Sequence, residues 1–146
     1  MTLTEHNYYM NIAIEQALLA NSNDEVPVGA IIVFKNKIIA KAHNRCEKLT
    51  DFTAHAEMQV LKLASKYLQS KYLNDCTLYV TLEPCLMCAG ATFWTRLGTI
   101  VYGAKDNKRG YLSKTKNALH PKTKVIGAIL EDECSKLLKD FFKEKR

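Results

Sequence analysis

Short apolar runs alternate with segments of helical periodicity along this 146-residue chain, and that alternation is the strongest constraint on its fold. The apolar runs predict five strands, at residues 28–34, 38–42, 77–82, 99–102 and 125–130. A turn at residues 35–37 joins the first two. Helical spacing predicts helices at residues 4–20, 54–68, 85–95 and 131–146, the first with Thr4 as its N-cap.

This order of elements is typical of the α/β class. It predicts a three-layer α/β/α domain with a mixed five-stranded sheet. Strand–helix–strand units cross over right-handed, so we expect the last three strands to be parallel and only the opening hairpin to be antiparallel. The length suits one compact domain, and the chain contains no repeat or linker, so we expect a single domain over residues 1–146.

The chain carries no apolar run of the roughly 18 residues that a membrane span needs, and residues 1–10 are polar. Its five cysteines are an odd number in a chain too long to need a disulfide scaffold, which favours a reducing compartment. We therefore expect a cytoplasmic protein with no membrane partner. Cys46, Cys76 and Cys134 have no partner spacing and are interpreted as ordinary thiols.

Three potential metal ligands lie where predicted helices begin, His55 at one start and Cys85 and Cys88 at another. In an open α/β sheet such helix starts meet at one edge, so we expect these side chains to converge. The partial positive charge of a helix N-terminus lowers a thiol pKa and favours the thiolate that zinc requires. Three ligands leave a fourth tetrahedral position open to water, and zinc lowers the pKa of that water to near 7. The pattern predicts one catalytic Zn²⁺ per subunit.

Taken alone, the Cys85 and Cys88 pair also fits a redox site or two buried thiols, although Pro84 ahead of it disfavours a redox pair. Glu57 argues for catalysis. It lies two residues after His55 in the first helical turn, close enough to reach a bound water without ligating the metal. We therefore expect Glu57 to carry protons as a general acid and base.

The net charge of +6 is concentrated in one stretch, which we call the basic segment, residues 105–124. It holds one acid, Asp106, and seven bases, whereas the rest of the chain is neutral. A segment of this kind attracts a phosphate backbone. The alternative is a charged loop that only keeps the protein soluble. The seven bases are Lys105, Lys108, Arg109, Lys114, Lys116, Lys122 and Lys124.

The His-x-Glu element at 55–57 and the Pro-Cys-x-x-Cys element at 84–88 match the zinc deaminase pattern. The chain resembles the cytidine deaminase-like superfamily and, within it, the bacterial tRNA adenosine deaminases that convert adenosine to inosine at the anticodon wobble position. The resemblance spans nearly the whole chain and rests on residues 25–30, 43–45, 53–57, 79–91, 101–106 and 140–142.

The resemblance implies roles for further residues. Asn44 would hydrogen-bond the purine, Ala56 would offer its backbone N–H beside the reacting carbon, and Val28 would line the base pocket. Asp106 and Lys108 would contact nucleotides that flank the target in a splayed tRNA anticodon stem-loop. The resemblance also implies a homodimer whose RNA site draws on both subunits.

The chain departs from the family pattern at two places. Phe52 stands where proline is usual, so the loop that leads to His55 is expected to differ. After Gly110 the sequence continues as Tyr111-Leu112-Ser113-Lys114 in place of the Gly-Ser-Leu-Met type found in many members.

Two other functions fit the same motifs. One is a deaminase of a free nucleobase or nucleoside, of guanine or cytosine type, but a small uncharged substrate has no need of seven clustered cations. The other is a non-catalytic zinc or RNA-binding module, which the intact Glu57 disfavours.

Overall fold

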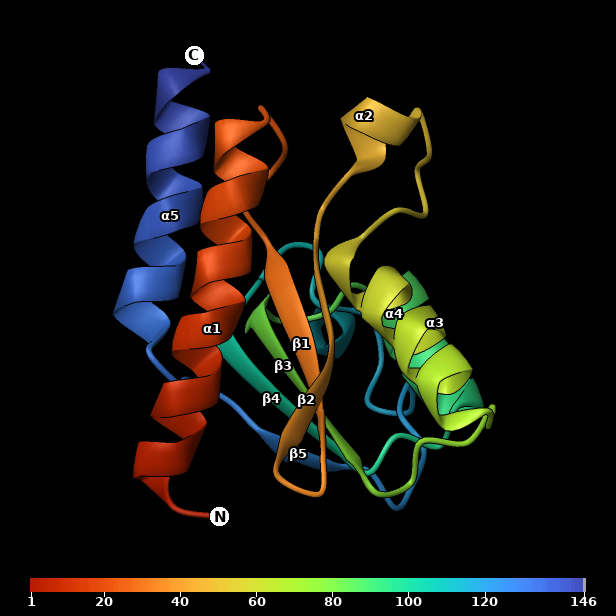
Figure 1. Ribbon diagram of the computed structural model, residues 1–146. Coiled ribbons are helices and arrows are strands. Elements are labelled where there is room, and N and C mark those ends of the chain that lie inside the picture. Colours follow the sequence, from red (N-terminus) through yellow and green to blue (C-terminus); the bar gives the residue numbers. More distant parts are fainter. Residues whose placement is uncertain (146) are drawn as a thin grey trace.

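The computed structural model describes residues 1–145, arranged in three layers around a central sheet (Figure 1). The helices are α1 (Leu3–Ser22), α2 (Cys46–Leu49), α3 (Ala56–Leu68), α4 (Leu86–Trp94) and α5 (Glu131–Glu144), with a 3-10 turn, η1, at Tyr111–Ser113. The strands are β1 (Gly29–Phe34), β2 (Lys37–His43), β3 (Cys76–Leu82), β4 (Thr99–Ala104) and β5 (Lys124–Ile126). Helices α1 and α5 cover one face, and α3 and α4 cover the other (Figure 1). The predicted α/β/α fold with a mixed five-stranded sheet is confirmed.

The strands lie in the order β2-β1-β3-β4-β5, and β3, β4 and β5 are parallel as predicted. The expectation that only the hairpin would be antiparallel was wrong, because β1 also pairs antiparallel with β3, Ala30 opposite Val80. Strand β1 is buried along nearly its whole length, so it takes an interior position, whereas the mixed burial of β2 suits the sheet edge. Lys35 and Asn36, both with positive φ, form the two-residue turn between β1 and β2.

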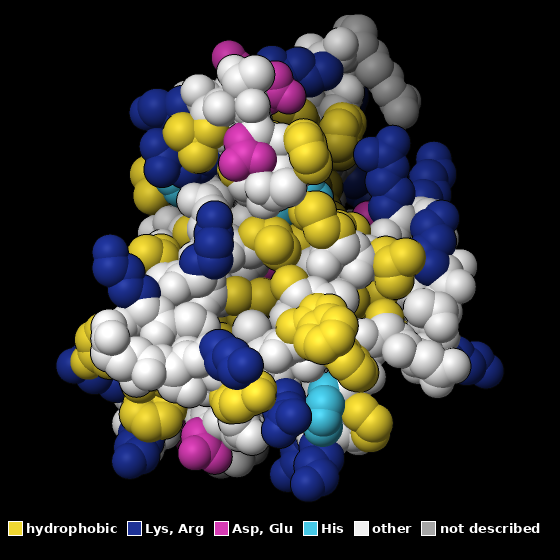
Figure 2. All heavy atoms as spheres, turned by 90° about the vertical axis from the view of Figure 1, so that its right-hand side faces the viewer, with side chains coloured by type: hydrophobic (Ala, Val, Ile, Leu, Met, Phe, Trp, Pro, Cys, Tyr) yellow, Lys and Arg dark blue, Asp and Glu magenta, His cyan; other side chains and the backbone are white. Residues whose placement is uncertain are grey.

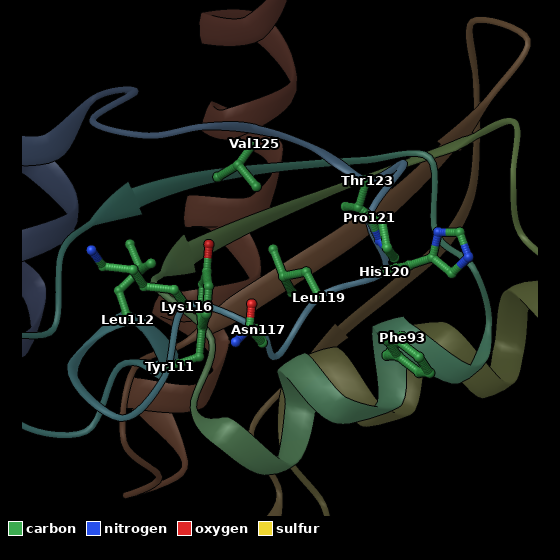
Figure 3. A pocket seen from close by; sticks show the side chains of 10 residues that line it. All are labelled: Phe93, Tyr111, Leu112, Lys116, Asn117, Leu119, His120, Pro121, Thr123 and Val125. Carbon is green, nitrogen blue, oxygen red and sulfur yellow. The ribbon is translucent and has the colours of Figure 1, made fainter.

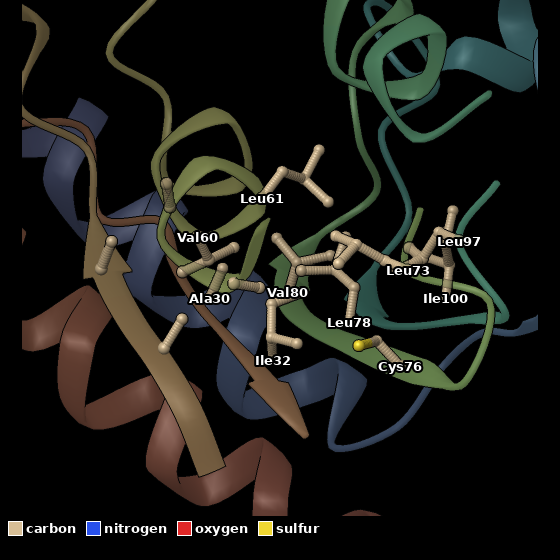
Figure 4. Close-up of a cluster of buried hydrophobic side chains, with 14 of the residues drawn as sticks. Ala30, Ile32, Val60, Leu61, Leu73, Cys76, Leu78, Val80, Leu97 and Ile100 are labelled. Carbon is tan, nitrogen blue, oxygen red and sulfur yellow. The ribbon is translucent and has the colours of Figure 1, made fainter. Parts of the chain in front are cut away.

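Alternate residues of the central strands supply two hydrophobic clusters, one on each face of the sheet. Ala30 and Ile32 point toward α3, where Figure 4 shows them packed with Val60 and Val80. Ile31 lies on the opposite face, in the cluster that includes the α1 residues of the core. The sheet is therefore packed against helices on both faces. This packing supports the ends of the strands next to which α3 and α4 begin.

Two predicted helix ends differ from the structure. Helix α1 begins at Leu3, and its N-cap is Thr2, not Thr4, because the Thr2 Oγ1 accepts the Glu5 N–H at 3.2 Å. The last helix was predicted to run to residue 146; it ends at Glu144, and residue 146 lies outside the described residues.

The last strand is also shorter than predicted, three residues in place of residues 125–130. A Cβ on Gly127 would lie 2.6 Å from the Tyr102 ring, so the chain crosses that ring and leaves the sheet there. Ala128 and Leu130 then adopt positive φ, and the buried Ile129 donates its N–H to the Tyr102 carbonyl. In the sequence this segment is a short apolar run, and such a run does not show at which residue the strand stops pairing with its neighbour.

The packing of α1 on β1 can be tested at Gly29, the first residue of β1. A Cβ there would lie 2.1 Å from the Ala13 carbonyl oxygen, which is helix backbone and cannot yield without moving α1. We expect Gly29→Ala to lower the free energy of unfolding by about 1–3 kcal/mol, measured by urea denaturation. Leu18→Ala, on the exposed side of α1, is the control and should change it far less. Equal losses would contradict the tight packing.

Candidate metal centre and active site

Two helix starts position the three predicted metal ligands. His55 is the N-cap residue of α3 and Cys85 that of α4, both with extended backbone, and neither side chain caps its own helix. Their side chains are therefore free to turn toward each other. Cys88 follows one turn later in α4 and is fully buried. Pro84 is compatible with this local structure because a proline just before a helix lacks an N–H that would have had no helical partner anyway.

The ligand atoms of His55, Cys85 and Cys88, which we call the metal cluster, all lie within 4.8 Å of one another. The His55 Nδ1 is 3.5 Å from the Cys88 Sγ and 3.7 Å from the Cys85 Sγ. Zinc bonds of about 2.3 Å to sulfur and 2.0–2.1 Å to nitrogen, at a tetrahedral angle, separate the two ligand atoms by about 3.6 Å. The cluster thus has the donor set and the spacing that a tetrahedral cation requires.

The two thiols differ in acidity because they share a hydrogen bond. The bond to Cys88, assisted by His55, lowers the pKa of Cys85 to about 4, which makes it a thiolate at neutral pH. The same bond, together with burial, raises the pKa of Cys88, which keeps its proton. The hydrogen bond to Cys85 also raises the pKa of His55. A divalent cation would take over the role of these shared protons and bind both sulfurs as thiolates.

Glu57 faces this cluster from the first turn of α3 with only 3% of its surface exposed. Its Oε1 is a buried side-chain oxygen with no hydrogen-bond partner. Burial raises the pKa of Glu57 to about 7, and a hydrogen bond from its own backbone N–H, together with His55 and Cys88, offsets that effect only in part. A buried acceptor left unpaired costs free energy unless a ligand satisfies it. A carboxyl that titrates near neutrality beside a cation site is suited to moving protons.

The three residues predicted to bind the base are joined by hydrogen bonds. The Asn44 Oδ1 accepts the Ala56 N–H at 2.8 Å, and the Asn44 N–H donates to the Val28 carbonyl at 3.1 Å. The Ala56 N–H predicted to serve the substrate is thus already engaged by Asn44. This bond orients the Asn44 amide, whose NH₂ group has no partner among the described residues. Val28 itself is 4% exposed and belongs to the core that packs against α3.

Asp106 and Lys108 lie in the β4–η1 loop, residues 105–110. The Asp106 Oδ1 accepts the backbone N–H groups of Lys108 at 3.1 Å and Arg109 at 2.9 Å, which folds the loop back on itself. This is an Asx-type turn, and it fixes the loop from within. Lys108 is exposed, so its ammonium group is available to solvent and ligands.

All seven bases of the basic segment are exposed, and none of them forms an ion pair within the described part of the chain. Between α4 and this segment lies a hollow of about 520 Å³ (Figure 3). Phe93 of α4 lines one side of it, and Leu119 and His120 line the other. The ring centroids of Phe93 and His120 are 5.7 Å apart. Figure 2 shows the face that carries α3 and α4, with hydrophobic side chains near its middle and lysine and arginine side chains around them.

Two buried acids were missed in the sequence. Glu25 accepts the backbone N–H groups of Glu47 and Lys48 at 3.0 and 2.8 Å and so holds α2, a short helix that is not among the predicted elements. Glu83 accepts those of Asp106 and Leu112. Both are 2% exposed. The available signal was an acid placed directly against apolar residues, as in Leu82-Glu83-Pro84.

The remaining cysteines lie outside the metal cluster. Burial raises the pKa of Cys76 to about 11 and that of Cys134 to about 12, and it raises the pKa of Cys46 as well, so none is an activated thiol. All five cysteines are free.

Phe52, at the position where the resemblance leads us to expect proline, is 84% exposed. In the same loop the Asp51 Oδ1 accepts hydrogen bonds from the backbone N–H and the hydroxyl of Thr53. No helix among the described residues has the length and apolarity of a membrane span.

The fold and the metal cluster define a nucleobase-deaminase type of domain, and residues 4–146 match the family model of the MafB19-like deaminases. A tRNA-specific adenosine deaminase of Aquifex aeolicus (strain VF5) is 44% identical over 143 residues, which is 95% of each chain. The chain therefore belongs to the tRNA-specific adenosine deaminase family, and the resemblance seen in the sequence is confirmed.

Solved structures agree with this assignment. One, from a study of A-to-I editing by tRNA:A34 deaminases at the wobble position, has a TM-score of 0.83 and 36% identity, and the match covers 90% of this chain and 99% of that chain. A guanine deaminase from Bacillus subtilis has 38% identity, but the match covers 68% of this chain and 64% of that chain, with a TM-score of 0.66. The match to the tRNA deaminase is therefore more complete over both chains.

The raised pKa of Glu57 predicts that the metal-free protein becomes less stable as the pH rises. Because folding raises this pKa from 4.5 to about 7, stability is lost as the pH rises through that range, by on the order of 3 kcal/mol. Glu57→Gln removes the titration, so the variant, in the presence of chelator, should match the wild type near pH 5 and exceed it at pH 8. Thermal unfolding at both pH values measures this.

Glu15→Gln is the matched control, because it removes the same charge from an exposed position on α1. It should not reproduce the gain at pH 8. A Glu57→Gln variant whose advantage is the same at both pH values would contradict the assigned titration.

Proposed function

We propose that this protein deaminates adenosine to inosine in tRNA, by zinc-dependent hydrolysis at the wobble position of the anticodon. The observation that carries the proposal is the unpaired, buried Glu57 Oε1 beside the metal cluster. Hydrolytic deamination needs a cation and one proton-carrying group that does not bind it; the site offers three ligands for the first and Glu57 for the second. The relatives named as tRNA-specific adenosine deaminases support the substrate.

His55, Cys85 and Cys88 would hold one zinc ion per subunit through Nδ1 and two Sγ atoms, a set that fits zinc in type and spacing. When bound, zinc acts as a Lewis acid that makes water nucleophilic near pH 7. The chain supplies the rest of the site: two thiols at the start of α4, where the helix dipole favours negative sulfur, and a buried setting that strengthens electrostatic interactions.

Glu57 carries the protons. Its carboxylate takes a proton from the attacking water as the C–O bond forms at the amino-bearing carbon of adenine. The carboxyl then protonates the ring nitrogen. As a carboxylate again, it takes the proton of the new hydroxyl group on that carbon and delivers it to the amino group, which leaves as ammonia when the C–N bond breaks and the C=O bond of inosine forms. Adenosine and water thus give inosine and ammonia. A pKa raised by burial suits a group that must both accept and donate in each cycle.

Asn44 and Val28 would form the base pocket, with the Asn44 amide donating to the purine and Val28 against its apolar face. The Ala56 N–H supports this geometry through its bond to the Asn44 Oδ1. Since β2 ends at His43, one residue before Asn44, the sheet itself positions the amide. Directed hydrogen bonds to the base edge are how single-stranded RNA is recognised.

Binding of the tRNA anticodon stem-loop rests on the basic segment, whose seven cations have no acidic partner among residues 1–145. Asp106 and Lys108 would contact the nucleotides that flank the target adenosine. We also infer one domain over residues 1–146 acting in the cytoplasm, which the free cysteines and a tRNA substrate both support.

We propose further that the protein is a homodimer through the face of α3 and α4. Trp94 is 77% exposed at the end of α4, and a Cβ on Gly90, one turn earlier, would meet no atom within 4 Å. A glycine inside an exposed helix is unfavourable by about 1 kcal/mol relative to alanine, and the chain itself gives no reason for it. The close approach of a helix from a second subunit would explain why a glycine is present at this position. The other exposed apolar residues on these helices are Leu63, Tyr67, Leu86 and Met87.

An assay on an anticodon stem-loop, beside free adenosine, guanine and cytosine, tests the substrate. We expect a gain of one mass unit in the RNA, from adenosine to inosine, and little turnover of the free compounds. The KM for RNA should rise steeply with salt, because phosphate contacts release counterions. Fast turnover of a free base without inosine in the RNA would favour the nucleobase deaminase instead.

Variants separate catalysis from metal binding in the same assay. Glu57→Ala should retain zinc and RNA binding while turnover falls by orders of magnitude. Cys88→Ser should lose zinc as measured by mass spectrometry, whereas Cys46→Ser, a half-buried thiol outside the cluster, should retain it. Full activity of Glu57→Ala would remove Glu57 from the mechanism.

The dimer is tested by light scattering. We expect a mass of about twice the 16.6 kDa of one chain, and a single-chain mass for Trp94→Glu because a charge cannot be buried there. Tyr8→Glu, an exposed aromatic residue on α1 at the other face of the sheet, is the control and should remain dimeric. A wild-type protein with the mass of one chain would overturn the homodimer.

A further inference from the structure

Glu83 lies between the metal cluster and the β4–η1 loop, and its two carboxylate oxygens contact the loop and η1, one each. It follows the last residue of β3 and precedes Pro84 and Cys85. Its Oε1 accepts the Asp106 N–H at 3.1 Å, and its Oε2 accepts the Leu112 N–H at 3.1 Å. The side chain thus bridges the two ends of the loop that contains Lys108 and Arg109.

The loop closes around this carboxylate. A Cβ on Gly110 would lie 2.2 Å from the Glu83 Oε2, so only glycine allows the approach. Gly110 has an ordinary negative φ of −62°, which shows that space and not backbone conformation requires the glycine. The Tyr111 N–H donates to the Pro84 carbonyl at 2.9 Å, and Cys85 forms an isolated β-bridge with Gly110.

The buried carboxylate of Glu83 fixes the positions of its backbone donors. Glu83 is 2% exposed and forms no ion pair among the residues described, so its burial is costly unless hydrogen bonds compensate. Charge-assisted bonds to backbone N–H groups are stronger than neutral ones and hold their donors at defined positions. The contacts therefore favour precise placement of Asp106, whose own carboxylate then shapes the turn through Lys108 and Arg109.

We propose that Glu83 is a positioning residue for the RNA substrate, which holds the β4–η1 loop at a set distance from the metal cluster. The inference rests on the proposed function. Glu83 is not one of the three ligands of the cluster, and within residues 1–145 its carboxylate bonds go to Asp106 and Leu112, through which it acts. It joins the segment that carries the chemistry, residues 84–88, to the segment that grips the nucleotides beside the target.

The test is Glu83→Gln, which retains size and one acceptor but turns an NH₂ group toward a backbone N–H. We expect the KM for an anticodon stem-loop to rise about tenfold, which corresponds to one charge-assisted bond, with kcat within about threefold and zinc content unchanged. Gly110→Ala adds a Cβ that crowds the same carboxylate and, at 2.5 Å, the Asp106 carbonyl oxygen, so it should also raise the KM for the stem-loop while kcat stays within about threefold. Hydrogen exchange should show faster exchange of the Asp106 and Leu112 amides in both variants.

Tyr79→Phe is the matched control, because it removes a buried hydrogen bond of 2.8 Å to His6 in the opposite core cluster. It should lower stability without raising KM. If Glu83→Gln loses stability in the same way while KM and amide exchange stay unchanged, the positioning role is overturned. Loss of zinc with a fall in kcat would also overturn it, because Glu83 would then support the metal cluster.

The two proposals fail in different ways. A wild-type protein that makes no inosine in any stem-loop would refute the proposed function. The anchoring of the loop would then be decided by amide exchange, in which unchanged rates at Asp106 and Leu112 overturn it.

Discussion

The site depends on one geometric constraint, the meeting of two helix N-termini at the same edge of the sheet. Helix α3 begins after His55 and α4 begins after Cys85, and both helices pack on the face of the sheet that β1 and β3 support. A nitrogen and two sulfurs come within 4.8 Å because both helix starts are fixed by the core beneath them. Moving either helix by a fraction of its diameter would separate the donors, so the hydrophobic core is a condition for the chemistry.

Buried carboxylates organise the surroundings of this edge in two different ways. Glu25 and Glu83 accept backbone N–H groups from α2 and from the β4–η1 loop, and both are fully used as structural acceptors. Glu57 is equally buried but retains an unpaired oxygen and a raised pKa. The contrast supports the role proposed for Glu57: an acid whose acceptors are satisfied holds backbone, whereas an unsatisfied acid beside a candidate cation site is suited to exchanging protons.

Charge and apolar surface are distributed in a way that fits both proposed partners. The basic segment leaves seven cations exposed, and its first six residues form the β4–η1 loop that Glu83 joins to residues 84–88. The apolar residues of α3 and α4 gather instead near the middle of one face, with cations around them (Figure 2). An RNA that follows the cations would approach the site from the rim of this face, while a second subunit would cover its centre.

The sequence by itself determined the α/β class and the order of the five strands and four main helices, and it predicted the candidate metal donors and the candidate proton carrier, because apolar periodicity and the two motifs at 55–57 and 84–88 are local signals. Only the tertiary structure decided that β1 pairs with β3, that the last strand ends at Ile126, and that Glu25 and Glu83 anchor loops. Strand order and the partners of a buried acid depend on contacts between residues far apart in the chain. Those contacts form only when the layers pack, and no local pattern of residues records them.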